Sequence, residues 1–504
     1  MKNSVKTILG NSIGAKGVVV DVECHLSNSL PNIVIVGFAA KSIDEAKERI
    51  RGALASSEIK LPKKRITINL APADVPKEGS SFDLAIAISI MKTAGIVKNG
   101  SEGAIVIGEL GLDGSIRPVR GIIGKILAAK DLGINSFIIP FGNLEQASLI
   151  PDIEVIAVSN LKDTYNLLNS GKLVFKRTSS EKLKNYHENT KDSVLFDDIS
   201  GQERAKRALV IAAAGHHNIL MSGPPGTGKS MLAKALRSIM PPLSVKEKLE
   251  VTHLHSLANK NFDNIIHDRP VRSPHHTSSQ VSIVGGGSSP RPGEISLSHH
   301  GILFFDELPE FNRSVLEALR QPLEDNRISV SRAKDSVDYP AHFILVATAN
   351  PCPCGYYDSK KECICLPTSI VRYQKKISGP VIDRIDLYVD VEDIDHKKLL
   401  KTNHSQKKSS DYRSIVGKAR DRQISKYGKL NSELTNRDIK KLSRLDKEAE
   451  NMLNQAAEKL GLSARGYVRS IKVASTIADL SSKDKIGVAE ISEALQYRKM
   501  PVKL

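Results

Sequence analysis

The sequence predicts an α/β multidomain protein whose central domain contains a parallel sheet. Its 504 residues are too many for a single core and suggest about three domains. Strand-like and helix-like patterns alternate from 1 to 170 and again from 193 to 395, whereas only helical patterns follow from 396 to 504. We therefore expect an α+β domain at 1–170, a linker at 171–192, a parallel-sheet core at 193–395 and a basic helical domain at 396–504.

The first of these domains is predicted from short alternating segments. Apolar runs typical of strands occur at 17–22, 32–37, 65–70 and 136–140. Helical periodicity is present at 43–56, 84–93 and 121–132. The stretch 176–192 is charged and poor in large apolar side chains, which is typical of a linker. These patterns predict a compact α+β domain and a connection after it.

The core domain carries the most specific pattern of the chain. Residues 223–230 read G-P-P-G-T-G-K-S and fit the phosphate-loop pattern G-x-x-x-x-G-K-[ST] at every fixed position. An apolar strand pattern at 218–221 precedes the run, and a helical pattern at 231–236 follows it. Backbone N–H groups of such a loop surround phosphate oxygens, while Lys229 reaches the β and γ phosphates and the Ser230 hydroxyl joins Mg²⁺. The pattern predicts a nucleoside triphosphate bound by Gly223, Pro224, Pro225, Gly226, Thr227, Gly228, Lys229 and Ser230.

Two further apolar strands end in polar side chains suited to phosphate chemistry. The run 301–307 ends in Asp306 and Glu307. Asp306 is expected on the Mg²⁺ side of the phosphate loop, and Glu307 is expected to polarise the attacking water. The run 343–350 ends in Asn350, whose amide is suited to hold that water near the γ phosphate.

Downstream of these strands, Arg384 lies between acidic residues. An arginine offered to a neighbouring subunit stabilises the charge that develops during phosphoryl transfer. The alternative is an ion pair within the chain, with Asp383 or Asp386 as its partner. The sequence leaves both interpretations open.

The positive charge of the chain is concentrated in its last fifth. The net charge is +17, and residues 397–504 hold 25 Lys and Arg against 12 Asp and Glu. A basic domain joined to a nucleotide-binding core favours a polyanionic partner, most commonly nucleic acid. Lys440, Lys441 and Arg444 are the candidate contacts, and Arg465, Arg469 and Lys472 have the spacing of a single helix face. The alternative is a solvated lysine-rich surface.

Four of the five cysteines form two C-x-C pairs after Asn350. They are Cys352, Cys354, Cys363 and Cys365. Four thiolates at this spacing can surround one Zn²⁺ tetrahedrally and tie the loop together. Reduced thiols and redox-active pairs are the two alternatives.

Half of the fourteen histidines lie between 253 and 300, including the pairs 275–276 and 299–300. Adjacent side chains on extended backbone point to opposite faces, so neither pair is a natural chelate. We interpret these histidines as polar loop residues.

Several longer segments together resemble a known family. They are Asp197 to Gln202, Arg272 to Thr277, Gly285 to Glu294, Ile295 to Gly301 and Leu462 to Tyr467. In these segments, and over essentially the whole chain, the protein resembles magnesium-chelatase-like AAA+ proteins of the ComM (YifB) family. The resemblance implies an AAA+ core, a helical C-terminal lid, and ATP with Mg²⁺ as cofactors.

The same resemblance implies a function. It points to a homo-hexameric DNA helicase that hydrolyses ATP and drives branch migration in homologous recombination and natural transformation, acting on single-stranded and branched DNA. Arg465 would be the arginine of the lid that reaches the γ phosphate, with Arg469 as the next candidate. The 285–294 loop is too rich in glycine and proline to be a packed element. By this likeness, Arg291 and Lys260 are candidate phosphate contacts of pore loops, and a passive surface loop is the alternative.

The N-terminal domain resembles Lon-type proteases in two segments. Residues 76–83 place Ser81 at the nucleophile position, and 124–129 carry Lys125 in the segment of the general base. Phe82 and Asp83 replace the small residues that normally follow the serine, and Asp83 could hold Lys125 protonated. The resemblance to the ComM family implies that this domain has a Lon-like fold without proteolytic activity.

Two rival functions remain beside the DNA motor. One is a chelatase-type ATPase that remodels a partner protein, and the other is an ATP-dependent Lon-like Ser–Lys protease. Because no apolar run approaches the roughly 18 residues of a membrane helix and no signal-peptide core is present, we expect a cytoplasmic protein with no membrane partner.

Overall fold

The structure is a computed structural model, and its residues fall into two compact units. The first unit comprises residues 1–187 and 244–267, and the second comprises 188–243 and 268–504. The structure describes residues 4–10, 17–37, 43, 45–77, 79–98, 101, 103–170, 173–178, 194–258, 263–287, 291–331, 336–359, 361–377, 379–393, 408–442 and 445–498.

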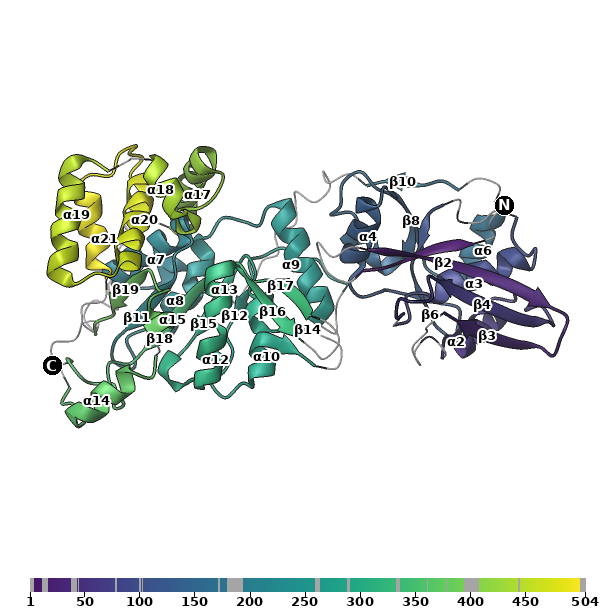
Figure 1. The fold of residues 1–504 in the computed structure, drawn as a ribbon, viewed down its shortest axis with the longest axis horizontal. Helices are drawn as coiled ribbons and strands as arrows, with labels where there is room; N and C mark the ends of the chain where they lie inside the picture. Colours follow the sequence, from purple (N-terminus) through teal and green to yellow (C-terminus); the bar gives the residue numbers. More distant parts are fainter. Residues whose placement is uncertain are drawn as a thin grey trace. The chain divides into compact units, whose positions relative to one another are not determined.

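The first unit is built on an eight-stranded mixed sheet (Figure 1). Its strands in spatial order are β10 (Lys176–Arg177), β9 (Glu154–Val158), β8 (Ser136–Pro140), β5 (Ile105–Val106), β1 (Val5–Leu9), β2 (Val18–Ser27), β4 (Arg65–Ala71) and β3 (Asn32–Val36). A separate hairpin joins β6 (Glu109–Leu110) to β7 (Ile116–Arg117). The strands and helices expected in this part of the chain are present, but β2 runs five residues beyond its expected end, and β10 lies in the stretch that we expected to be a linker.

Helices cover both faces of this sheet. They are α2 (Ala46–Ser56), α3 (Asp83–Thr93), α4 (Ile122–Asp131), α5 (Leu144–Ala147), α6 (Leu161–Asn169) and α9 (Val245–Ala258), with a 3-10 turn η1 (Phe141–Asn143). Successive strand residues face opposite sides, so Val106 joins the core beneath α2 and α3 while Ile105 joins the core beneath α4. Helix α9 packs beside α4 and contributes Leu249 to the second core, which also includes Ile265. The 244–267 segment of the central region thus packs with the first unit.

The residues of this unit that resemble Lon-type segments in the sequence lie in a different arrangement from the one we expected. Asp83 accepts two hydrogen bonds from Arg49, at 2.7 and 3.1 Å, instead of pairing with Lys125. Burial lowers the pKa of Lys125 to about 8. No hydrogen bond joins Lys125 to Ser81 or Asp83, all three of which the structure describes. The prediction of an Asp83–Lys125 pair was therefore wrong, because the nearby Arg49 takes the carboxylate.

The second unit contains the predicted parallel sheet. Its five strands lie in the order β12 (Val271–Arg272), β15 (Ile302–Phe305), β18 (Ile344–Ala349), β11 (Ile219–Ser222) and β19 (Leu387–Asp390), all parallel. The strand that precedes the phosphate loop is therefore flanked by β18 and β19. Polar residues that follow these neighbouring strands meet at one edge of the sheet.

Helices and two hairpins surround the sheet. The helical segments are η3 (Phe196–Asp198), α7 (Glu203–Gly215), α8 (Lys229–Ile239), α10 (Gln280–Val284), α11 (Glu294–Leu297), η4 (Leu308–Glu310), α12 (Arg313–Ala318), α13 (Arg320–Asp325), α14 (Pro367–Gln374), α15 (Gly379–Ile382), α17 (Ser409–Tyr427), η5 (Asn431–Glu433), α18 (Asn436–Leu442), α19 (Lys447–Leu460), α20 (Ala464–Leu480) and α21 (Val488–Gln496). Figure 1 shows α19, α20 and α21 lying side by side. Among the described residues, no helix is both long and apolar enough to span a bilayer.

The glycine-rich 285–294 loop is partly a packed element, contrary to our expectation. β13 (Gly285–Gly286) and β14 (Arg291–Pro292) form an antiparallel hairpin beside a second hairpin of β16 (Arg327–Ser331) and β17 (Ser336–Pro340). Gly285 has φ +108°, and a side chain there would lie 2.6 Å from the carbonyl oxygen of Arg291. The glycines permit this close pairing, which the composition alone suggested would be absent.

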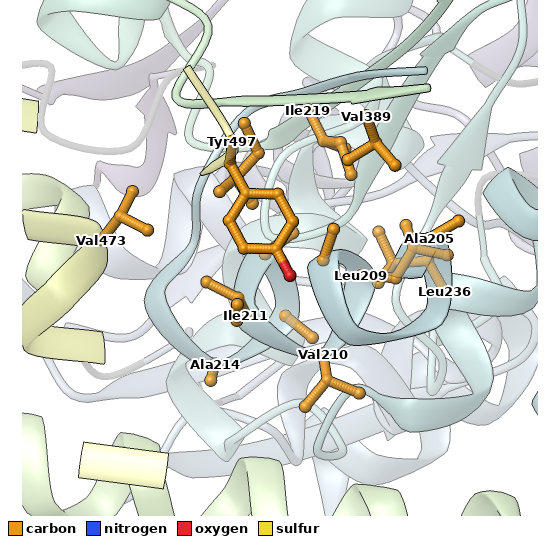
Figure 2. Packing of buried hydrophobic residues seen from close by; sticks show 14 of the residues in the cluster. Ala205, Leu209, Val210, Ile211, Ala214, Ile219, Leu236, Val389, Val473 and Tyr497 are labelled. Atoms are coloured by element: carbon orange, nitrogen blue, oxygen red, sulfur yellow. The ribbon is translucent and has the colours of Figure 1, made fainter. Parts of the chain in front are cut away.

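Helix α7 lies at the centre of the core of the second unit. Leu209 and Ile211 of this helix belong to the same buried cluster as Ile219 of the sheet and Val473 of α20, and Figure 2 labels all four. All four side chains are fully or almost fully buried. The C-terminal helices and the parallel sheet therefore share one apolar core.

Histidines gather at the edge of the sheet where the strands begin. His216 precedes β11, His300 precedes β15 and His342 precedes β18. The rings of His216 and His342 stack at 4.0 Å, and His300 meets His342 at 5.6 Å. Our interpretation of His299 and His300 as loop residues missed this packing, since His299 is buried and its Nδ1 accepts a hydrogen bond from the backbone N–H of His342 at 3.0 Å.

This cluster makes the stability of the protein dependent on pH. Burial holds the pKa of His216 well below 6.5, and the nearby side chains His342, Arg420, His300 and Arg269 act in the same direction. In the unfolded chain the imidazole takes up a proton below about pH 6.5, whereas the folded state resists it. The unfolding free energy should thus fall by up to about 1.4 kcal/mol per pH unit on acidification below pH 6.5.

Denaturant unfolding of wild type and His216→Asn between pH 8 and pH 5 measures this effect. Asparagine suits the positive φ of 60° at this position and does not titrate. His216→Asn should lose less stability than wild type on acidification, while His275→Asn, at an exposed histidine, should behave as wild type. Equal pH slopes in all three proteins would contradict the assignment.

Candidate nucleotide site

The phosphate loop joins β11 to α8 at the sheet edge where the strands end. Gly226 and Gly228 both have φ +85°, a conformation that side chains other than glycine rarely adopt. Gly223 approaches the backbone so closely that a side chain would collide with the carbonyl oxygen of Val391. The backbone thus requires glycine at these three positions.

The Lys229 side chain is buried at the mouth of the loop. Its Nζ donates to the carbonyl oxygens of Gly223 at 2.6 Å and Pro224 at 2.7 Å, and to Asn350 Oδ1 at 3.3 Å. Burial lowers the pKa of Lys229, while the carboxylates of Asp306, Glu307 and Asp393 oppose that shift. The structure therefore brings together the lysine and the amide that the sequence predicts for one site.

The ends of β15 and β18 and the first turn of α8 meet at Asp306. Ser230 Oγ donates to one carboxylate oxygen of Asp306 at 2.9 Å, and Thr348 Oγ1 donates to the other at 2.6 Å. Thr348 Oγ1 also accepts from the backbone N–H of Glu307 at 2.9 Å. Hydroxyl and carboxylate oxygens in this arrangement are the ligands that Mg²⁺ prefers.

The sequence predicts Glu307 as a residue of this site, but it does not predict Thr348. Glu307 is exposed and takes the left-handed φ of 54° just after the buried strand β15. Thr348 is fully buried and was not predicted as a site residue. The available signal was a hydroxyl inside the otherwise apolar run 343–349.

The four cysteines form a cluster directly after Asn350. Cys352 Sγ lies 3.4 Å from Cys354 Sγ and 3.7 Å from Cys363 Sγ. The sulfurs of Cys354 and Cys363 are 3.6 Å apart. All four sulfurs, including that of Cys365, lie within 4.8 Å of one another. The structure therefore brings the two C-x-C pairs together.

Arg384 lies at the opposite edge of the sheet from the phosphate loop. Its carbonyl oxygen accepts from Asn218 Nδ2 at 3.1 Å, and Asn218 precedes β11 whereas the loop follows it. Its guanidinium pairs with Glu324 and donates to the carbonyl oxygen of Pro380 at 2.7 Å. The ion pair within the chain is therefore formed, but the predicted partners Asp383 and Asp386 were wrong. Among the described residues the guanidinium pairs with Glu324 instead.

The two arginines that the resemblance suggested for a lid, Arg465 and Arg469, lie in different environments. Arg469 Nη1 pairs with Asp386 Oδ1 at 3.1 Å, at the sheet edge where the strands begin. Lys472 Nζ donates to the carbonyl oxygen of Ser432 at 2.8 Å, and burial lowers its pKa. The spacing predicts one basic helix face for Arg465, Arg469 and Lys472, but Arg469 and Lys472 are only partly exposed and bind groups of the same chain. Arg465 alone is exposed, in the first turn of α20.

The candidate nucleic-acid contacts are only partly described. Arg291 is exposed on β14, and Lys440 is exposed on α18. Lys260, Arg444 and the side chain of Lys441 lie outside the described residues.

Family models of magnesium chelatase match successive parts of the chain. "Magnesium chelatase, subunit ChlI" matches 195–399, "Subunit ChlI of Mg-chelatase" matches 22–143, and "Magnesium chelatase, subunit ChlI C-terminal" matches 406–498. "Competence protein ComM" of Haemophilus influenzae is 42% identical over 492 residues, which cover 97% of this chain and 96% of that protein. This chain belongs to the ComM (YifB) family of magnesium-chelatase-like AAA+ proteins.

Other relatives differ in how much of the chain they cover. YifB of Escherichia coli is 38% identical over 97% of this chain and 95% of its own length. The magnesium-chelatase 38 kDa subunit of Rhodobacter capsulatus is 26% identical over 31% of this chain and 50% of its own length. Membership of the ComM (YifB) family confirms the resemblance seen in the sequence and implies an ATPase that uses ATP and Mg²⁺.

Thr348 offers a direct test of this geometry. Thr348→Val removes the hydroxyl but keeps the shape, which leaves the Glu307 N–H unpaired and Asp306 without one donor. We expect the unfolding free energy to fall by about 1–3 kcal/mol and Mg·ATP to bind more weakly. Urea unfolding and fluorescent-nucleotide titration measure both effects, with Thr348→Ser as the control that keeps the hydroxyl. Wild-type stability and affinity in Thr348→Val would contradict the assignment.

Proposed function

We propose that this protein is an ATP-dependent, ring-forming DNA helicase that promotes branch migration in homologous recombination and natural transformation. The observation that carries the proposal is likeness to Competence protein ComM over 97% of the chain. The placement of the phosphate loop and Arg384 at opposite edges of one sheet supports the ring, because a neighbouring subunit can then complete each site.

Within one subunit, the residues around the phosphate loop have separate roles in ATP hydrolysis. Lys229 neutralises the β and γ phosphates, while Ser230 and Asp306 hold Mg²⁺. Glu307 polarises the attacking water, and the Asn350 amide orients it. Thr348 is a positioning residue, since it fixes the Asp306 carboxylate and the backbone at Glu307.

Arg384 acts on the nucleotide of a neighbouring subunit in this proposal. Its own phosphate loop lies at the other end of β11, so it has no short path to its own nucleotide. Its Glu324 partner is more than half exposed, so the pair can open where a phosphate approaches. Arg465 remains the proposed lid arginine, since its exposed guanidinium has no partner among the described residues, whereas Arg469 is held by Asp386.

The DNA contacts of this proposal lie on exposed basic side chains. Arg291 extends from the β13–β14 hairpin, and Arg437 and Lys440 lie on α18. Contacts of this kind attract phosphate regardless of base sequence. Arg420, in contrast, is buried and donates to the carbonyl oxygen of Ala213 at 2.8 Å, so it belongs to the fold.

The two rival functions receive less support. Chelatase subunits such as that of Rhodobacter capsulatus are similar over about a third of the chain, whereas ComM is similar over nearly all of it. A Ser–Lys protease needs its lysine within hydrogen-bond reach of the serine, and no such bond joins the described Ser81 and Lys125.

The role of Arg384 is tested by mixing subunits. Arg384→Ala should bind ATP yet lose about a thousandfold in turnover, the usual value of an arginine finger. Mixing it with Lys229→Ala should restore part of the turnover, since one kind of mixed interface has an intact lysine and an intact arginine. Glu324→Gln, which breaks the pair but keeps Arg384, and Lys375→Ala, at an exposed lysine, should both remain active. No rescue at any ratio, together with loss of turnover in Glu324→Gln, would contradict action between subunits.

The DNA function is tested by displacement of a labelled strand from forked and four-way DNA. Wild type should displace it only with hydrolysable ATP, and Glu307→Gln should bind ATP and DNA without displacement. Arg437→Gln/Lys440→Gln should flatten the plot of log affinity against log salt by about two units. Lys447→Gln/Lys459→Gln, two exposed lysines of α19, are the matched control. Absence of ATP-dependent displacement by an active ATPase would overturn the proposal.

A further inference from the structure

We propose that Cys352, Cys354, Cys363 and Cys365 bind one structural Zn²⁺, and that this metal holds the nucleotide site in its working geometry. The evidence for the metal site comes from the four cysteines and does not depend on the proposed function. The effect of the metal on ATP turnover rests on the proposed function of Lys229 and Asn350.

The spacing of the sulfurs distinguishes among the three interpretations of these cysteines. Tetrahedral Zn²⁺ with Zn–S bonds of about 2.3 Å separates its sulfurs by about 3.8 Å. In the structure the sulfurs of Cys352, Cys354 and Cys363 lie 3.4, 3.6 and 3.7 Å apart, close to this value, and that of Cys365 lies within 4.8 Å of them. A disulfide requires about 2.05 Å, and all five cysteines of the chain are free thiols. The geometry therefore favours one shared metal over redox pairs.

The backbone around the cluster is arranged as it is around thiolate ligands. The Tyr357 N–H donates to Cys352 Sγ at 3.3 Å, and the Cys354 N–H donates to Cys365 Sγ at 3.4 Å. Such donors stabilise sulfur that carries negative charge and fix the orientation of metal ligands. Four separate neutral thiols would not need them.

The loop that holds the cysteines has little else to hold it in place. No helix or strand occurs in its described part between β18 and α14. Two of its apolar side chains face solvent, Ile364 being 85% and Leu366 69% exposed. A segment without an apolar core needs a cross-link to be ordered, and a bound metal supplies that free energy.

This loop is joined to the nucleotide site at two points. Cys352 follows Asn350 by two residues, and Asn350 Oδ1 accepts from Lys229 Nζ. Gly355, with φ +86°, lies so close to the phosphate loop that a side chain would come within 2.7 Å of Pro225 Cδ. A metal that joins the four cysteines therefore fixes the position of the Asn350 amide beside Lys229 and that of the Gly355 backbone beside Pro225.

The first experiment measures metal on the full-length protein purified without chelator. We expect one zinc per chain by elemental analysis, and Co²⁺ in its place should give the absorption bands of a tetrahedral thiolate complex. Cys363→Ser should lose the metal, while Cys24→Ser, at the cysteine outside the cluster, should keep it. Cys365→His should also keep zinc, because it offers three sulfurs and one imidazole, which guards against loss of metal through misfolding alone.

The second experiment separates the metal from its effect on the nucleotide. Cys363→Ser should turn over ATP about ten- to a hundredfold more slowly, since displacement of a catalytic group by 1 Å can cost about a hundredfold. Gly355→Ala keeps all four cysteines but crowds Pro225. It should retain one zinc per chain and bind fluorescent ATP more weakly than wild type.

Each outcome decides one part of the proposal. Four reactive thiols without zinc in wild type, or a mass that shows a disulfide, would overturn the metal site. Loss of zinc from Cys363→Ser with unchanged turnover and nucleotide affinity would overturn the coupling. Zinc-loaded wild type without ATP turnover would instead overturn the proposed function and leave the metal site standing.

Discussion

Asn218 fixes the three strands on which the nucleotide site depends. Its backbone N–H donates to Asp386 Oδ2 at 3.1 Å, its Nδ2 donates to the carbonyl oxygen of Arg384 at 3.1 Å, and its Oδ1 accepts from the Leu345 N–H at 2.9 Å. One amide thus sets β18 and β19 in register with β11 at the edge where the strands begin. Each such bond contributes about 1 kcal/mol, and leaving its partner unpaired costs more. Because the strands are parallel, the same register determines where the phosphate loop, Thr348 and Asp390 stand at the far edge.

Asp386 extends this control from the sheet to the C-terminal helices. Burial alone would raise the pKa of its carboxyl, but the nearby His217 ring, at 3.5 Å, and the charge of Arg469 outweigh burial and hold the pKa at about 2. His217 in turn contacts Thr476 at 2.8 Å, so α20 is attached to the sheet edge at two points. A buried carboxylate keeps its charge only where such partners surround it, and breaking one partner leaves an uncompensated charge. The docking of α20 is therefore specific rather than only apolar.

The parts of this site that the sequence predicts are those that follow from local pattern. The phosphate loop, the acidic pair at 306–307 and the amide at 350 all stand at strand ends, and strands are recognisable from their own residues. Contacts between distant segments were not predictable in this way. The Arg384–Glu324 pair spans 60 residues and the Arg469–Asp386 pair spans 83, and spacing along a helix could not tell that Arg469 and Lys472 bind groups of the same chain. The Asp83–Lys125 pairing failed for the same reason, since Arg49 is 34 residues away.

Arg384 and Asp386 lie two residues apart, and their side chains bind different partners. Arg384 pairs with Glu324, whereas Asp386 pairs with Arg469 of α20. Arg384 is bound through its carbonyl oxygen to Asn218, and Asp386 binds the same Asn218 through its carboxylate. In the proposed ring, a phosphate on the neighbouring subunit draws the Arg384 guanidinium away from Glu324. The same short turn also carries Asp386, the ion-pair partner of Arg469 on α20. In the proposed ring, the residue that would contact one nucleotide and the residue that anchors the C-terminal helices would therefore lie in a single short turn. No longer chain of contacts is required, because the strand edge already joins the two groups.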